Sequence, residues 1–341
     1  MRVKLADVCE RGSSNLKQAD IPGKSGDYPV YGASGYIGNV DFYQQKKPYV
    51  AVVKDGAGIG RAMLLPAESS VIGTMQYLLP KSVVLPEYLF YVVKHMHLEK
   101  YFSGATIPHI YFRDYQNEEF TLDDLNKQHE VVTTLRKVES VIENRQQQLQ
   151  KLDELVKARF VEMFGDVIYN DRKWECKQFS DITTSRLGKM LDTKHQTGTC
   201  KYPYLANFNV QWFRFELNNL NEMDFNEKDR EEFCLEDGDL LVCEGGEIGR
   251  CAVWHNQVKK CFFQKALHRV RCNQNIILPD YLSWWFKYNC ENGGLAAIEG
   301  AKATISHLTG AKMKMLDVAV PPIELQEQFV DFIKQVDKSK F

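Results

Sequence analysis

Two arginines that each follow a glycine-rich turn are the residues of this chain best suited to contact a charged ligand. Arg61 ends the sequence GAGIGR, and Arg250 ends the related sequence GGEIGR. Glycines in such turns allow positive φ angles and close approach of the backbone. An arginine on a glycine loop can donate to a phosphate or to the O6 and N7 atoms of guanine. A solvated charge at a strand end is the simpler alternative for each arginine alone.

The glycine turns also invite comparison with a dinucleotide-binding loop, because the first one follows a β-branched strand. The glycines at 56, 58 and 60 do not have the spacing G-x-G-x-x-G, and those at 245, 246 and 249 depart further from it. No strand–helix–strand crossover of suitable length follows either turn. We therefore expect tight hairpin turns and no nucleotide cofactor.

A histidine closes a second motif, ATIPH at 105–109 and ATISH at 303–307. A histidine can act as a general base, but no Ser or Cys nucleophile with a carboxylate recurs beside both, so we expect no hydrolase. The candidate contact residues for a charged partner are Lys54, Arg61, Thr106, His109, Arg250, Lys302, Thr304 and His307. Ser34 and Asn207 lie beside matching aromatic runs and are candidates for contacts with base edges.

The motifs of several common catalytic sites are missing from the sequence. There is no G-x-x-x-x-G-K-[ST] phosphate loop, no Asn-Pro-Pro-aromatic tetrapeptide of amino-methyltransferases, and no repeated Asp…Glu-x-Lys cluster of a nuclease. The nine cysteines include no Cys-x-x-Cys pair and have no histidines at zinc-ligand spacing. The sequence therefore predicts no catalytic residue, metal or cofactor in this chain.

The motifs recur in the same order in the two halves of the chain. Between the glycine turns and the histidine motifs stand PEYL at 86–89 and PDYL at 279–282. The offset between the copies grows along the chain, as loop insertions in a duplicated domain would produce. The period is far longer than the roughly 20–50 residues of a solenoid repeat. The sequence therefore predicts two whole domains of one fold, an arrangement that suits a target with two parts.

Short strands and one helix are predicted around the motifs of each copy. Apolar, β-rich runs at 49–53 and 239–243 lead into the glycine turns, with further strands at 63–65 and 76–79. Helices are expected from 86 to 100 and from 279 to 288, each with a proline at its first position. We expect an α+β fold with two homologous, mixed, strand-rich domains at 1–122 and 166–320.

A long helix is predicted between the two domains, at 123–165. From 125 to 164 there is neither Pro nor Gly, and apolar residues alternate at spacings of four and three. This heptad pattern predicts a coiled coil about 60 Å long, and Gly165 is expected to end it. Its predicted seam includes Leu135, Val138, Ile142, Leu149, Leu152 and Val156.

A second, shorter helix is predicted at 321–341, where the sequence PPIELQEQ opens it. We expect it to pack antiparallel on the long helix as a coiled coil. Because it is about half as long, we expect it to be truncated and to leave residues 146–164 of the long helix without an intramolecular partner. That segment would then pair with a second copy of the chain, or fray until a partner protein binds.

The charge balance and the cysteines limit the class of protein. The net charge is −2, whereas a free-standing DNA-binding protein is usually basic, so DNA binding would need local basic patches or charge from partner subunits. No apolar run approaches about 18 residues, and the N-terminus has no apolar signal segment. The odd number of cysteines is typical of reduced thiols, so we expect a cytoplasmic protein with no membrane association.

The whole chain resembles the specificity subunit of type I restriction-modification systems. The most specific match is PPIELQEQ at 321–328, which is similar to the entry of the family's conserved helices. The GAGIGR and GGEIGR turns, the PEYL and PDYL helix starts and the two TI-x-H stretches support it. The first copy departs from the pattern, because TLDDLNKQ at 121–128 lacks the prolines.

The resemblance implies a non-catalytic subunit in which each domain reads one half of a bipartite site in double-stranded DNA. The two antiparallel helices would set the spacer between the halves and dock modification subunits, which bind S-adenosylmethionine and methylate adenine. Restriction subunits would join to form the nuclease. The near-neutral charge fits, because the modification subunits share the DNA clamp. A coiled-coil scaffold that binds only proteins, and a nucleotide-dependent enzyme that uses the glycine turns, are the alternatives.

Overall fold

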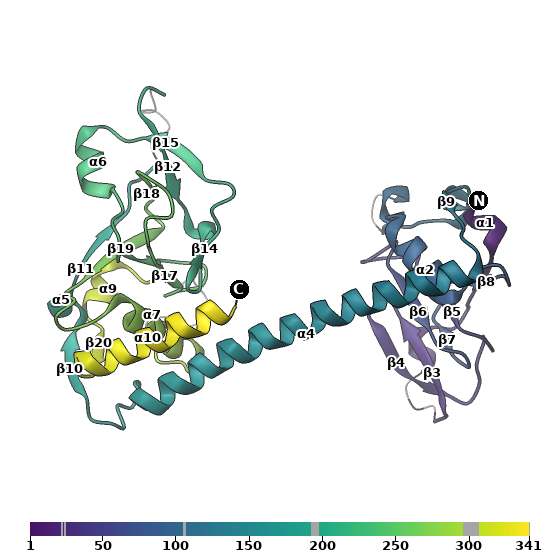
Figure 1. Ribbon diagram of the computed structural model, residues 1–341, viewed down its shortest axis with the longest axis horizontal. Helices are drawn as coiled ribbons and strands as arrows, with labels where there is room; N and C mark the ends of the chain where they lie inside the picture. The colour runs from purple at the N-terminus through teal and green to yellow at the C-terminus, as the bar shows by residue number, and fades with distance from the viewer. Residues whose placement is uncertain (22, 24, 105–106, 192–197, 296–306, 341) are drawn as a thin grey trace. The chain divides into compact units, whose positions relative to one another are not determined.

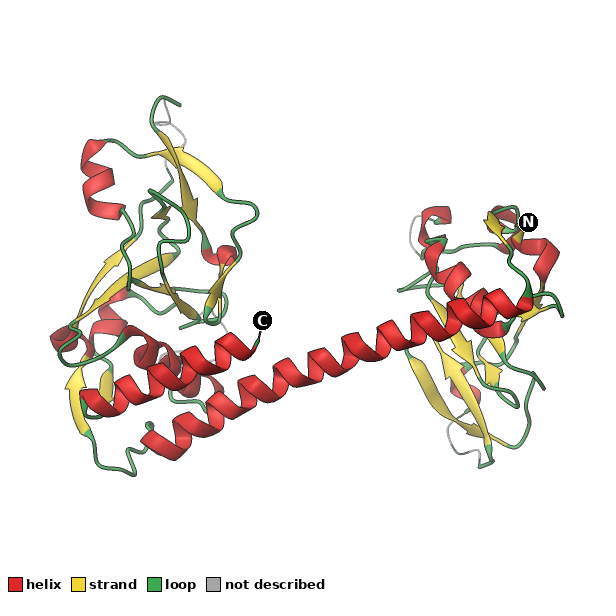
Figure 2. Cartoon of the chain, in the orientation of Figure 1, coloured by secondary structure: helices red, strands yellow, loops and turns green. Residues whose placement is uncertain are grey.

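The computed structural model describes residues 1–341 except 22, 24, 105–106, 192–197, 296–306 and 341 (Figure 1). The chain divides into two compact units, Met1–Gln146 and Gln147–Phe341. The boundary falls inside α4, which runs from Leu125 to Phe164 and has the bounds expected of the long helix. Each unit combines strands with short helices (Figure 2), as the α+β prediction requires.

The described residues of the first unit form three sheets. The four-stranded antiparallel sheet has the order β2-β8-β5-β6, with strands Cys9–Ser13, Met75–Pro80, Tyr49–Val53 and Ala62–Leu65. The three-stranded sheet has the order β4-β3-β7, with strands Gly35–Val40, Tyr28–Gly32 and Ser70–Val71. Strands β1 (Arg2–Lys4) and β9 (Glu119–Thr121) form a pair. The helices are α1 (Leu5–Val8), η1 (Gln18–Asp20), α2 (Pro86–His95), η2 (Leu98–Tyr101) and α3 (Phe112–Tyr115).

The second unit repeats these sheets and adds a hairpin. The four-stranded sheet has the order β11-β19-β16-β17, with strands Thr183–Leu187, Leu267–Cys272, Leu240–Cys243 and Cys251–Val253. The three-stranded sheet has the order β15-β12-β18, with strands Asn221–Asp224, Lys201–Leu205 and Phe262–Phe263. The paired strands are β10 (Glu175–Gln178) with β20 (Asp317–Val320), and β13 (Val210–Gln211) with β14 (Arg214–Phe215). The helices are α5 (Phe179–Ile182), η4 (Asn207–Asn209), α6 (Glu227–Phe233), α7 (Pro279–Glu291), α9 (Gly310–Lys314) and α10 (Ile323–Ser339).

The two units therefore share one topology, and the predicted duplication is confirmed. Both four-stranded sheets are antiparallel, and both three-stranded sheets contain one parallel pair, β3 with β7 and β12 with β18. The hairpin β13–β14 and helix α6 belong to the second unit, without counterparts among the described elements of the first. Both of these elements precede the second glycine turn, so they do not account for the offset that increases between the later motifs.

The central strand of each four-stranded sheet is buried on both faces. All residues of β5 and β16 are buried. Val50 and Val52 share a hydrophobic core with α2, whereas Ala51 and Val53 share another with the three-stranded sheet. Side chains alternate between the faces of a strand, so each four-stranded sheet lies between a helix and the smaller sheet. This arrangement explains why both strands are continuous apolar runs.

A buried glutamine ties the start of the last helix to the core of each unit. Gln128 accepts a hydrogen bond from Leu85 N at 2.9 Å and donates to Val83 O at 2.9 Å. Gln326 accepts from Leu278 N at 2.9 Å and donates to Ile276 O at 3.0 Å. Each glutamine also donates to the backbone just before its own helix, to Asp123 O and Pro321 O at 2.8 Å. The bonds are equivalent although the first copy lacks the prolines.

Helix α10 packs in antiparallel orientation on the C-terminal part of α4. The Phe329 ring lies near the start of α10, with its centroid 5.5 Å from that of Phe160 and 5.3 Å from that of Phe164. At the other end, Lys340 Nζ pairs with Asp153 Oδ1 at 2.9 Å. Contacts therefore run in opposite directions along the two helices, and the predicted antiparallel packing is confirmed.

The expectation that residues 146–164 lack an intramolecular partner is wrong. Val156, Phe160 and Phe164 have exposed fractions of 2%, 0% and 0% and belong to a hydrophobic core with Phe329. Helix α7 also covers this end of α4, since Tyr281 on α7 stacks on Phe160. The lengths of α4 and α10 alone do not show this contact. This end of α4 is thus part of the second unit's core.

The predicted seam divides between two environments. The buried or half-buried members are Leu135, Leu149, Leu152 and Val156. Val138 and Ile142 are exposed, with exposed fractions of 49% and 50%, and Val141 beside them reaches 66%. The seam is covered at the C-terminal end of α4 and exposed in its middle, so the coiled coil is shorter than the heptad pattern predicted.

Two further predictions differ from the structure in detail. The helix expected from 86 to 100 ends at His95, because His97 has a φ of +51° and begins the separate turn η2. The helix expected from 279 to 288 extends to Glu291. All nine cysteines lie in the described residues, and none of them forms a disulfide. Burial raises the pKa of the Cys9 thiol to about 12.

Candidate functional site

Each glycine turn joins two antiparallel strands of the four-stranded sheet. Val53 N donates to Arg61 O at 3.0 Å, and Cys243 N donates to Arg250 O at 2.8 Å. Gly60 and Gly249 have φ angles of +80° and +78°, which favour glycine. A Cβ on Gly60 would lie 2.4 Å from Glu99 N. The turns are hairpins packed against neighbouring segments, as predicted, and not strand-to-helix phosphate loops.

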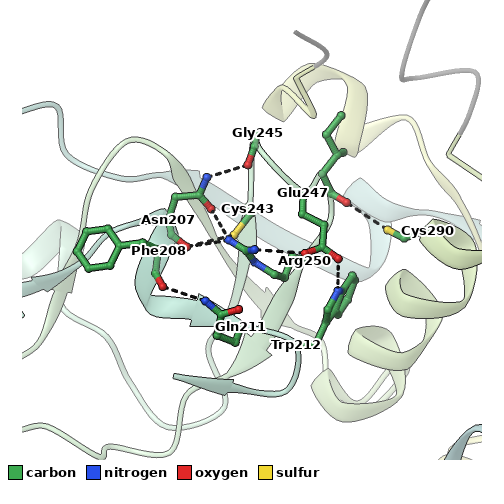
Figure 3. A network of polar contacts seen from close by, with 10 residues as sticks. Asn207, Phe208, Gln211, Trp212, Cys243, Gly245, Glu247, Arg250 and Cys290 are labelled. Carbon is green, nitrogen blue, oxygen red and sulfur yellow. Dashed lines mark hydrogen bonds and ion pairs between the residues drawn. The ribbon is translucent and has the colours of Figure 1, made fainter. Parts of the chain in front are cut away.

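The arginine of each turn reaches the loop that follows a strand of the smaller sheet. Arg61 Nη1 donates to Ala33 O at 3.2 Å. Arg250 Nη2 donates to Asn207 O at 3.1 Å and lies 3.3 Å from Asn207 Oδ1 (Figure 3). In both units the guanidinium therefore connects the two sheets.

The parallel strand pairs show that these loops are equivalent. Tyr31 pairs with Val71 in the first unit, and Leu205 pairs with Phe263 in the second. The residue after each pair donates a backbone hydrogen bond to the opposite strand. Ile72 N donates to Tyr31 O, and Gln264 N donates to Leu205 O, both at 3.0 Å. This register aligns Ala33 with Asn207 and Ser34 with Phe208. The two units therefore present different side chains from the same place.

In the second unit a polar network surrounds Arg250, whose side chain is 16% exposed. Its Nη1 lies 3.2 Å from Glu247 Oε2, and Glu247 Oε1 accepts from Trp212 Nε1 at 2.6 Å. Asn207 Nδ2 donates to Gly245 O at 2.8 Å (Figure 3). These contacts satisfy much of the guanidinium inside the protein, so the structure gives Arg250 a positioning role.

In the first unit a charged triad occupies the base of the turn. Asp55 Oδ1 lies 2.7 Å from His109 Nδ1, and Asp55 Oδ2 lies 2.6 Å from Lys54 Nζ. Partial burial alone would raise the pKa of the Asp55 carboxyl, but hydrogen bonds and charges from Lys54 and His109 lower it below its ordinary value. Arg61 is exposed, so it retains access to a ligand.

The triad does not recur in the second unit. Ile110 N donates to Lys54 O and Leu308 N donates to Glu244 O, which aligns Lys54 with Glu244 and the next residue, Asp55, with Gly245. A Cβ on Gly245 would lie 3.0 Å from His307 Nδ1, so His307 covers the turn where His109 does. A histidine–aspartate pair can orient a base, but a pair found in one copy is no shared catalytic device.

The predicted site residues that the structure describes gather at these two turns. They are Ser34, Lys54, Arg61 and His109 in the first unit, and Asn207, Arg250 and His307 in the second. Thr106, Lys302 and Thr304 lie outside the described residues. Sequence reasoning missed Asp55 and Glu247, because ion pairs that hold a loop have no spacing signature.

Chemically, these turns can donate and accept hydrogen bonds at an exposed surface. Across the part of the chain that the structure describes, no group of three His, Cys, Asp or Glu side chains is placed to hold a metal ion. In the same part, no helix has both the length and the apolar character needed to cross a membrane. The geometry is that of two related binding modules whose exposed turns differ.

The comparisons with known proteins identify the family. The model of the Type I restriction modification DNA specificity domain matches residues 1–154 and 171–341, so the chain belongs to this family and contains its domain twice. Membership implies a specificity role and not a catalytic one.

Solved structures show the same fold. The S subunit of a type I restriction-modification system from M. genitalium is similar with a TM-score of 0.64 and 14% identity, over 100% of this chain and 90% of that one. A chain from a structure on complex assembly and conformational transition of the type I R-M system has a TM-score of 0.55 and 13% identity, over 100% and 90%. The resemblance seen in the sequence is confirmed.

Proposed function

We propose that each unit of this chain reads one half of a bipartite site in double-stranded DNA. The observation that carries the proposal is the shared framework with divergent turns. The glutamine and arginine contacts recur, whereas Ser34 faces solvent where the second unit exposes Phe208. A single base pair contributes about 1–3 kcal/mol of discrimination. Two linked readers therefore gain selectivity and effective concentration together.

The described site residues are proposed to act in two ways. Lys54, Arg61, His109 and His307 are proposed to contact phosphates or base edges, because their donors lie at the turns. Arg250 is proposed to hold the second turn in place, since its guanidinium bonds internally. Thr106, Lys302 and Thr304 remain proposed DNA contacts.

We propose that α4 and α10 set the spacer between the two half-sites and dock modification subunits. The exposed apolar stripe of α4, defined here as Val138, Val141 and Ile142, supports a docking role, because helices bury such residues against partners. A second copy of the chain is the alternative occupant. Light scattering of the chain alone distinguishes the two, since self-association would double the mass.

The chemistry is proposed to lie in the partners. Modification subunits would bind S-adenosylmethionine and methylate adenine, and restriction subunits would add the nuclease. We also propose that this chain is cytoplasmic, because the absence of disulfides among its nine described cysteines is consistent with a reducing compartment.

Methylome sequencing tests the proposal. A host would express the modification subunit with this chain, and a matched host would express the modification subunit alone. The proposal predicts methylated adenines within one bipartite motif, in the first host only. Methylation without the chain, or an assembled complex that does not methylate, would refute it. The second result would indicate a protein scaffold.

A further inference from the structure

The loop that follows β12 in the second unit contains η4 and exposes an apolar side chain, Phe208. This residue is the middle one of η4 and has an exposed fraction of 54%. In Figure 3 its ring points away from the polar network around Arg250. Ser34 occupies the same place in the first unit and is also exposed. The two copies thus differ in chemistry at one shared position.

The turn that carries Phe208 is fixed by buried polar contacts. Asn209 is 1% exposed, and its side chain accepts from Ala206 N at 2.9 Å and donates to Glu216 O at 2.9 Å. Glu216 N in turn donates to Asn209 O at 2.8 Å. The oxygen and the nitrogen of this single side-chain amide therefore tie η4 to Ala206 and to Glu216, because a buried amide requires partners.

The carbonyls on either side of the exposed ring are also held. Gln211 Nε2 donates to Phe208 O at 3.0 Å, and Arg250 Nη2 donates to Asn207 O at 3.1 Å. The backbone of the turn is therefore constrained next to a side chain that gains little burial from it. A preorganised contact group loses less entropy on binding than a mobile one, so this arrangement favours recognition at Phe208.

The chemistry of the ring restricts what it can recognise on DNA. A phenylalanine side chain has no hydrogen-bond donor or acceptor. In the major groove the apolar group on a base edge is the C5-methyl of thymine. A serine hydroxyl both donates and accepts, so it suits polar edges. The difference between Phe208 and Ser34 would therefore produce different base preferences from one framework.

We infer that residues 208 and 34 are equivalent specificity-determining positions, and that Phe208 contacts a thymine methyl in the half-site read by the second unit. This inference rests on the proposed DNA-reading function and adds the residue and the base feature involved. It also assigns the network of Asn209, Gln211 and Arg250 a purpose, which is to hold the ring in a fixed place.

Methylation motifs of single variants test the positions. The chain with its modification subunit would be sequenced as wild type, Phe208→Ser, Phe208→Leu and Tyr169→Ser. Tyr169 is the matched control, because it is an 85% exposed aromatic residue of the same unit, away from η4. Phe208→Ser should lower the preference at one T·A position about tenfold. Phe208→Leu should largely keep it, and Tyr169→Ser should leave the motif unchanged.

Binding to uracil-substituted DNA tests the thymine methyl directly. Replacement of that thymine by uracil removes the methyl group and keeps base pairing. The assembled wild-type complex should then lose about tenfold in affinity, whereas the Phe208→Ser complex should not respond. Thermal unfolding should show all variants folded, because the substituted rings are exposed.

Two results overturn the inference. The wild-type complex could methylate a bipartite motif that Phe208→Ser leaves unchanged. That result would refute the specificity role of Phe208, while the proposed function would stand. A wild-type complex that ignores uracil at every thymine would refute the methyl contact in the same way. A complex with no sequence-specific methylation would remove the proposed function, and this inference with it.

Discussion

The two glycine turns show how one framework can carry two different surfaces. In the first unit the base of the turn holds Lys54, Asp55 and His109 in a charged triad. In the second unit Glu244 and Gly245 occupy the positions of Lys54 and Asp55. The polar network of that unit is centred on Arg250 instead. The hydrogen bonds that build the hairpins are the same in both. The side chains of the turn thus differ between the two units, while the hydrogen bonds of the sheet are shared.

The C-terminal end and the middle of α4 extend the comparison and give the largest expected effect. Phe160→Ala should lower the free energy of unfolding of the second unit by about 3–5 kcal/mol, because this fully buried ring contacts Phe164, Tyr281 and Phe329. Ile142→Ala on the exposed stripe should cost less than about 1 kcal/mol. Chemical denaturation would measure both.

Tryptophan fluorescence makes that test specific to one unit. All five tryptophans lie after residue 170, in the second unit. If Phe160→Ala left the denaturation midpoint detected by tryptophan fluorescence unchanged, the result would contradict the packing of α4 on α7 and α10.

The glutamine clamps come next in expected effect and test whether the repeated framework matters equally. Gln326→Ala would leave Leu278 N, Ile276 O and Pro321 O without their partner, at a cost of about 2–4 kcal/mol. Gln335→Ala is the matched control, because Gln335 is exposed on the same helix. The loss should appear in tryptophan fluorescence.

Gln128→Ala is the corresponding change in the first unit. It should destabilise that unit by a similar amount, seen by circular dichroism, and leave the tryptophan-detected transition unchanged. If both glutamine variants moved the tryptophan signal equally, the two units would not unfold separately and the comparison would fail.

The two arginines should differ in their effect on stability. Arg250→Ala removes a largely buried guanidinium that bonds Asn207 and Glu247, so it should cost about 1–3 kcal/mol. Arg61→Ala removes an exposed side chain and should cost about 0.5 kcal/mol or less. If thermal unfolding showed the same decrease in stability for both variants, the result would contradict the positioning role of Arg250.

The smallest expected effect is the pH dependence of the Asp55 triad. The pKa of Asp55 is lowered in the folded chain, so the carboxylate contributes stability above its ordinary value of 3.8, and that contribution is lost as the pH falls through the folded value. Asp55→Asn should therefore be less stable than wild type near neutral pH. The difference should shrink on acidification, as denaturation at several pH values would show. Gly245 has no carboxylate, so the stability of the second unit should lack this pH-dependent contribution.

Sequence reasoning predicted much of the framework because regular structure leaves periodic signals. The strand at 49–53 and the helix at 125–164 were found from apolar patterning and the absence of Pro and Gly. The duplication followed from motifs in matching order. The same reasoning misjudged the end of α4, because the heptad pattern does not show that Tyr281 and Phe329 cover it.

The site was less predictable, because its contacts join residues far apart in the chain. The arginines were selected from their place after the glycines, but their bonds to Ala33 and Asn207 depend on how two sheets pack. Phe208 lies in the aromatic run beside Asn207, and it is exposed. A single sequence carries no signal that separates a core aromatic from an exposed one within a short turn.

The most direct test of the central claim is whether each unit controls its own half of the DNA motif. Methylomes would be sequenced for the wild-type chain, Ser34→Ala and Phe208→Ser, each with the modification subunit. The account predicts a bipartite motif in which the first substitution alters one half and the second alters the other. An unsplit motif, or two substitutions that alter the same half, would contradict it.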